Sequence, residues 1–199
     1  MTRIITGTPD AASEHVEATA ALGATIAYGI PIAIAVAGIV EFGWNAISWT
    51  GATACGAIAS FAFLLFSMIG KRAGLTRMDM LDLLGSMLAP PHSNISRVTG
   101  FIIHEIDGAL LGVAYAYGLM FKAWPVNWGT GLVWGIILWA LALILMSSIG
   151  PLHPAIRNHL EEDPGPAAMN FGRMTPIGSL LGHAVYGVVL GILYAIWPF

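Results

Sequence analysis

The chain has 199 residues, of which 57% are hydrophobic and only 10% are charged, and its mean hydropathy is +0.77. A soluble domain carries about 25% charged residues, so this composition excludes an ordinary soluble protein and predicts that the chain sits in a lipid bilayer. The net charge of −3 comes without a run of basic residues, so we expect no nucleic-acid partner, and the single cysteine excludes an internal disulfide.

In chain order, residues 1–19 form a polar tail without the apolar core of a signal peptide, and residues 20–199 are expected to form one transmembrane domain. Five later segments reach the roughly 20 apolar residues that a membrane-spanning helix needs. The fold class is therefore an all-α membrane protein with five transmembrane helices, expected over about 20–44, 51–70, 97–122, 128–150 and 176–197.

Two segments between these spans have a pattern of their own. Thr76 and Asp79 have the spacing of a capping box, which predicts a short amphipathic helix over about 76–88, lying flat on the cytoplasmic membrane surface. The segment 151–175 contains four prolines and the acidic run 161–163. It is expected to be an irregular cytoplasmic cap, with the acidic run exposed to solvent.

The basic residues predict the orientation. With five spans, the N-terminal tail and the segments 71–96 and 151–175 share one side of the membrane. That side carries seven basic residues and the other only Lys122, which predicts a cytoplasmic N-terminus and a C-terminus outside the bacterial inner membrane. Five tryptophans at the predicted outer ends agree with this topology: Trp44, Trp49, Trp124, Trp128 and Trp197.

One pattern occurs twice, 79 positions apart. A histidine, two glycines and a tyrosine follow one another at i, i+4, i+8 and i+11, and so lie on one face of a helix. The two sets are His104, Gly108, Gly112, Tyr115 and His183, Gly187, Gly191, Tyr194. Each histidine lies seven residues inside its predicted helix, about 10 Å from the cytoplasmic interface. An ionisable group at such a depth is a functional-site hypothesis, and equal depth on parallel helices predicts a shared site.

The chemistry of this site has three interpretations. His104 and His183 can be the two axial ligands of a haem b, with the glycines making room for the flat macrocycle. Together with Asp107, which follows His104 by three residues, they can be a two-histidine, one-carboxylate ligand set for another metal. Alternatively, the glycines are only a helix-packing seam and the histidines only hydrogen-bond neighbouring helices.

The order of these motifs resembles small bacterial inner-membrane proteins that carry paired intramembrane histidines. The similarity rests on the stretch 78–87, the first histidine motif, the Trp-rich span from Trp128 and the closing motif 183–194, and it covers about residues 75–197. This group has no assigned function, so the resemblance implies a bacterial membrane location and draws attention to His104 and His183.

Three classes of function remain. The one we favour is a non-catalytic membrane subunit that binds haem b or another metal, within a larger complex or a self-associated assembly. The alternatives are a structural or assembly subunit without a cofactor, and a small transporter or channel. Polar groups cluster at one depth on two helices instead of following a path, which disfavours transport. The absence of a nucleophile–base pair or phosphate loop disfavours an enzyme.

Overall fold

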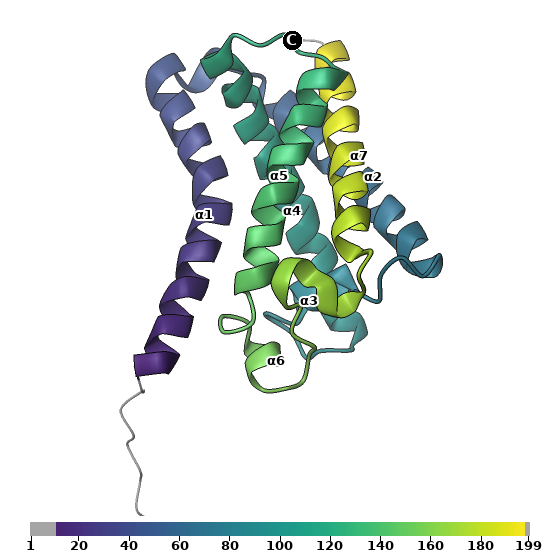
Figure 1. Cartoon of the computed structure of the whole chain (residues 1–199). Coiled ribbons are helices and arrows are strands. Elements are labelled where there is room, and N and C mark those ends of the chain that lie inside the picture. The colour runs from purple at the N-terminus through teal and green to yellow at the C-terminus, as the bar shows by residue number, and fades with distance from the viewer. Residues whose placement is uncertain (1–10, 198–199) are drawn as a thin grey trace, which may run out of the picture.

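The computed structural model describes residues 11–197, and within this range every regular element is a helix. Five helices are long and apolar enough to cross a membrane (Figure 1): α1 (Ala11–Phe42), α2 (Trp49–Arg72), α4 (Asn94–Lys122), α5 (Trp128–Ser148) and α7 (Thr175–Ile196). Four short elements connect them: η1 (Trp44–Ala46), α3 (Met80–Gly85), α6 (Pro154–Arg157) and η2 (Pro166–Phe171). The all-α, five-span prediction is confirmed.

The spans differ from their predicted bounds mainly at the N-terminus. The α1 helix already begins at Ala11, so residues 11–19 of the predicted polar tail are helical. Residues 1–10 of that predicted tail, and residues 198–199 at the end of the predicted domain, lie outside the described residues.

The outer surface of the helices is apolar. Val40 is 81% exposed, Ile69 63% and Ile196 71%, and large apolar side chains are exposed along all five spans. Side chains of this kind, on helices of this length, need lipid around them. The chain is a multi-pass membrane protein.

The helices are arranged as two antiparallel pairs with α1 alongside. The α2 helix packs on α4, and α5 packs on α7. The α2 helix also contacts α7, which joins the pairs, while α1 lies against α4 and α5 and diverges from them toward its N-terminus (Figure 1). We call the end of the bundle that holds α3, α6 and η2 the α3 end.

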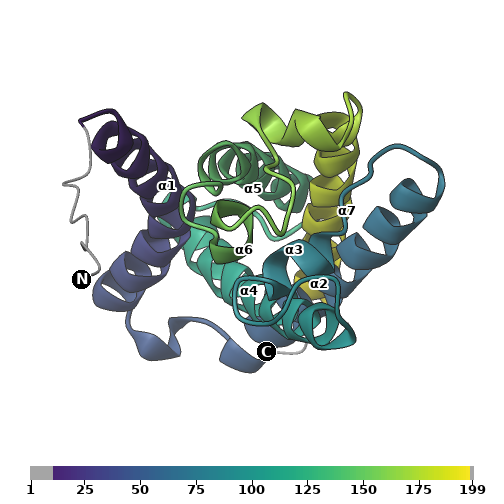
Figure 2. The ribbon, with the colours of Figure 1, turned by 90° about the horizontal axis from the view of Figure 1, so that it is seen from below.

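The short helix expected over 76–88 is α3, and it is shorter and more deeply placed than the sequence indicates. It spans only Met80–Gly85, and Asp82 and Leu83 are 3% exposed. A Cβ atom on Gly85 would fall on the backbone of Ser96 and Gly100 at the start of α4. Because these glycines let the two backbones touch, α3 packs directly on the start of α4 at this end of the bundle (Figure 2).

The segment 151–175 is a folded cap with a small core. Ile156, Ala168 and Phe171 are buried against Leu83 of α3 and Ile149. The backbone N–H of Arg77 donates to the carbonyl of Phe171 (2.8 Å), which ties this cap to the segment before α3. The cap and α3 therefore close one end of the helix bundle.

Candidate functional site

The four glycines of the repeated motif lie in two helix–helix seams. In the α2–α4 pair, a Cβ on Gly108 would collide with Ser60, and one on Gly112 with the carbonyl of Ala52. In the α5–α7 pair, a Cβ on Gly187 would collide with the carbonyl of Gly131, and one on Gly191 with that of Asn127. The neighbouring helices lie against all four glycines, so these positions serve helix packing, and Gly108 in addition lines the cavity described below.

The partner helices repeat as well. Ala52, Gly56 and Ser60 of α2 face the first motif, and Asn127, Gly131 and Gly135 face the second. Each member of the second set lies 75 positions after its counterpart, so the two helix pairs share one register. The repeated motif on α4 and α7 is thus one part of a repeated helix pair, and the partner residues on α2 and α5 are the other part. Small residues at four-residue spacing in the second and fourth predicted spans are the sequence signal for these partners.

His104 is bound to the neighbouring helix. Its Nε2 lies 3.3 Å from the Ser60 carbonyl oxygen, and the Ser60 hydroxyl donates in return to the His104 carbonyl oxygen (3.0 Å). If Nε2 carries the proton and donates, Nδ1 keeps a lone pair for another partner. His104 lies ten residues after the start of α4 at Asn94.

His183 is bound to its own helix. Its Nδ1 lies 2.8 Å from the Ser179 carbonyl oxygen, one turn earlier in α7. If Nδ1 donates there, Nε2 is the nitrogen that keeps the lone pair. His183 lies eight residues after the start of α7 at Thr175, a depth close to that of His104.

Phe63 of α2 contacts both imidazoles. Its ring centroid is 5.4 Å from that of His104 and 4.9 Å from that of His183. The two imidazole centroids therefore lie no farther apart than the sum of these distances. The shared location predicted for the two histidines is present, with α2 as the helix that joins them.

Both histidines line one intramembrane cavity of about 430 Å³. All five spans contribute to its wall, and Leu83 and Leu84 of the α3 region close it at the α3 end. Most lining residues are apolar. The ionisable and phenolic groups are His104, His183, Asp107, Tyr28 and Tyr186. On α1, Pro31 also lines the cavity, and because proline has no N–H, the carbonyl of Ala27 beside it lacks its usual helical donor.

The third position after each histidine differs between the motifs. Tyr186 is 4% exposed and donates from its hydroxyl to the carbonyl of Gly108 (2.8 Å), which links α7 to α4. Asp107 lines the cavity, and in the described part of the chain no hydrogen bond or ion pair reaches its carboxyl. Glu105 does not line this cavity, and its Oε1 is buried without a hydrogen-bond partner among the described residues.

The ligand atoms of His104, Asp107 and His183 are not gathered at metal-binding distance. Within residues 16–197, the one group of three histidine, cysteine or acidic side chains whose ligand atoms all lie within 4.8 Å of one another is Asp82, His92 and Glu161. The two intramembrane histidines do meet another requirement of a metal site, which is a hydrogen bond that holds each ligating imidazole in place. Each imidazole can donate one N–H to a backbone carbonyl and keep its other nitrogen free.

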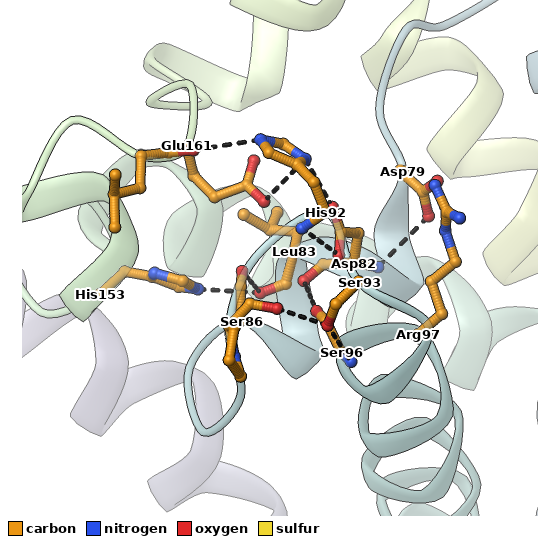
Figure 3. A network of polar contacts seen from close by, with 12 residues as sticks. Asp79, Asp82, Leu83, Ser86, His92, Ser93, Ser96, Arg97, His153 and Glu161 are labelled. Atoms are coloured by element: carbon orange, nitrogen blue, oxygen red, sulfur yellow. Dashed lines mark hydrogen bonds and ion pairs between the residues drawn. The ribbon is translucent and has the colours of Figure 1, made fainter.

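The group of Asp82, His92 and Glu161 lies at the α3 end and was missed from the sequence (Figure 3). The acidic run was expected to face solvent, and this is so for Glu162 and Asp163 but not for Glu161, whose side chain is 10% exposed. Burial raises the pKa of Glu161. The charge of Glu161 and a hydrogen bond with Asp82 raise the pKa of His92. No spacing in the sequence indicates this group, because its members come from three separate segments.

Comparison with known proteins adds no relative: no family model matches the chain, and no curated protein sequence or solved structure matches it either.

Proposed function

We propose that this protein is a non-catalytic membrane protein that binds haem b or another metal cofactor in the cavity lined by His104 and His183. The observation that carries the proposal is that two imidazoles from different helices line one largely apolar cavity, each with one nitrogen held by a backbone carbonyl. Neutral imidazoles fixed in this way are the usual state of histidine ligands.

In this proposal His104 offers Nδ1 and His183 offers Nε2 to the metal. Asp107, which has neither a hydrogen bond nor an ion pair among the described residues, offers a carboxylate as the third ligand of a non-haem ion. The cofactor supplies an electron-transfer or Lewis-acid centre, and the chain supplies ligands, orientation and exclusion of water. Because the motif glycines are packed against neighbouring helices, the room for a cofactor comes from the space between α1 and the two helix pairs.

A structural or assembly subunit without a cofactor is the second candidate. It is favoured by the hydrogen bonds that the two histidines already make, since these alone can account for an imidazole between helices. Glu105 does not line the cavity, and most of the cavity wall is apolar, which leaves a transporter or channel as the weakest alternative.

We further propose a bacterial inner-membrane location with the α3 end in the cytoplasm. Six described basic residues lie at that end, in the segments 71–97 and 157–173, against Lys122 at the other. The large apolar surface that remains on the helices supports association with other membrane subunits or with a second copy.

The test is the absorption spectrum and metal content of protein purified in detergent, measured on the same sample. We expect one haem or metal ion per chain in the cavity itself, lost in His104→Ala and in His183→Ala, beyond any ion held elsewhere in the chain. His159→Ala is the control, because His159 is exposed and lies outside the cavity. A folded wild-type protein that is colourless and free of metal would overturn the cofactor proposal and leave the structural one.

A further inference from the structure

A second group of ligand-type side chains lies outside the membrane spans, in the cap. It brings together Asp82 of α3, His92 from the segment between α3 and α4, and Glu161 from the segment between α6 and η2. The His92 Nδ1 is 2.9 Å from Asp82 Oδ2 and 3.7 Å from Glu161 Oε1. Ligands of a tetrahedral ion with bonds of about 2.0–2.2 Å lie roughly 3.3–3.5 Å apart, and the two observed distances bracket that value.

The buried carboxylate of Glu161 is incompletely paired. Its side chain is only 10% exposed, and its Oε1 has no hydrogen-bond partner among the described residues. Figure 3 shows this carboxylate turned toward the His92 ring. A buried acceptor without a donor is costly, so an oxygen held in this position indicates that something else satisfies it.

The His92 ring is oriented as a ligand would be. Its Nε2 lies 3.1 Å from the carbonyl oxygen of Leu160, which as an acceptor selects the tautomer with the proton on Nε2. The Nδ1 faces two carboxylates, and only a proton or a cation can sit between these three acceptors. Without an ion, Nδ1 carries that proton, and a bound cation takes its place.

The charges also favour a divalent ion. Asp82 is 3% exposed, so two carboxylates share a mostly buried site, and a doubly charged cation balances both. The mixed nitrogen and oxygen ligands favour a transition metal over magnesium or calcium, which prefer oxygen alone. The His92 side chain is 68% exposed, so the ion has access from solvent and keeps an open coordination position.

We propose that Asp82, His92 and Glu161 form a binding site for a divalent transition-metal ion, which ties α3 to the cap. This site is independent of the proposed intramembrane cofactor. Leu83, the neighbour of Asp82, lines the intramembrane cavity, so an ion held here fixes one end of that cavity.

The test uses full-length protein in detergent, stripped of metal with a chelator and titrated with Zn²⁺ by calorimetry. We expect one Zn²⁺ per chain at this site, with affinity at least about tenfold weaker in His92→Ala and in Glu161→Gln. Two matched controls are expected to bind as the wild type does. His159→Ala removes an exposed histidine with the same backbone φ of 57° as His92, and Glu162→Gln removes the acid next to Glu161.

The same titration in a His104→Ala/His183→Ala background separates this site from the intramembrane one, since the cap site is expected to keep its affinity there. Thermal unfolding in the same background gives a second readout, in which Zn²⁺ raises the melting temperature of the parent and the controls but not of Glu161→Gln. The proposal is overturned if the parent of that background binds no stoichiometric Zn²⁺, or if His92→Ala and Glu161→Gln bind it as tightly as their parent does.

Discussion

The α2–α4 and α5–α7 pairs use the same packing but surround their histidines differently. Both pairs have glycines in contact with the partner backbone at matched positions. In the first pair, however, the His104 ring bonds across to α2, and Ser60 returns a second bond. In the second pair, the His183 ring bonds within α7, and Gly135 occupies the position that matches Ser60.

This difference distinguishes the helix packing, which is the same in both pairs, from the surroundings of the histidines, which are not. The glycine positions agree in both pairs because close helix contact needs them, whatever the histidines do. The imidazoles do not share one hydrogen-bond pattern, so the common packing of the two pairs does not by itself require a histidine in each. Their common feature is the cavity and the contact with Phe63, and this supports a joint role there.

The largest effect is expected from the seam glycines. Gly112→Ala and Gly191→Ala each place a methyl group on a partner carbonyl, so each is expected to lower the free energy of unfolding by about 3 kcal/mol. Gly178→Ala in α7 is the control, since no atom of a neighbouring element lies within 4 Å of the position that its methyl group would take. Denaturation in detergent measures all three. A large loss in only one of the two seams would show that the pairs are not equivalent.

Tyr186→Phe tests the link between the pairs. Loss of the hydroxyl that bonds Gly108 is expected to lower the free energy of unfolding by about 1 kcal/mol, without a change in fold. Tyr28→Phe is the matched control on the cavity wall, because the Tyr28 hydroxyl makes no hydrogen bond within the described residues. Equal stability of the two variants would show that the Tyr186 hydroxyl does not contribute to joining the pairs.

Asp107→Asn distinguishes a ligand from a structural carboxyl. The side chain has no hydrogen bond or ion pair to lose among the described residues, so we expect a change in unfolding free energy of no more than about 0.5 kcal/mol. If Asp107 binds a non-haem metal, the variant is also expected to weaken metal binding by at least about tenfold. A large loss of stability with unchanged metal binding would argue that the carboxyl has a structural partner.

The smallest effect concerns an ion-pair cluster that joins α2, α4 and the start of α3. Asp79 lies 2.8 Å from Lys71 of α2 and 3.4 Å from Arg97 of α4. Burial opposes ionisation of Asp79, but the hydrogen bond from Lys71, the Asp82 N–H and the two cations outweigh it and lower its pKa.

Because the folded pKa of Asp79 is below the unfolded value, the stabilisation is present above about pH 4 and is lost as the pH falls through the folded pKa. Asp79→Asn is expected to unfold about 0.5 kcal/mol more easily at pH 6, and this gap closes toward pH 3. Unfolding curves of the two proteins across this range measure it. A difference in unfolding free energy that widens as the pH falls would contradict a lowered pKa of Asp79 in the folded protein.

The sequence predicts the spans well because hydropathy and length depend only on local composition. The sequence also draws attention to His104 and His183, and the structure places both on the wall of one cavity. The sequence does not reveal that Ala52, Gly56 and Ser60 face the first motif, because a helical period states which residues share a face but not which helix that face meets.

The α3 end was predicted less well for the same reason. The amphipathic pattern of 76–88 is compatible with a membrane surface, and it does not show that Gly85 packs against Ser96 and Gly100 or that Leu83 is buried in the core of the cap. Glu161 looked like part of a solvated acidic run. Its burial depends on where α3 and His92 lie, which no local pattern specifies.

We propose that His104 and His183 serve one shared site. A double-mutant cycle on cofactor affinity tests it most directly, with haemin and Zn²⁺ titrated into His104→Ala, His183→Ala and the double variant. The His92→Ala background removes the cap site from the Zn²⁺ measurement. Each single variant is expected to lose most of the affinity, and the double variant is expected to lose little more. Additive losses, or affinity unchanged in either single variant, would contradict a shared site.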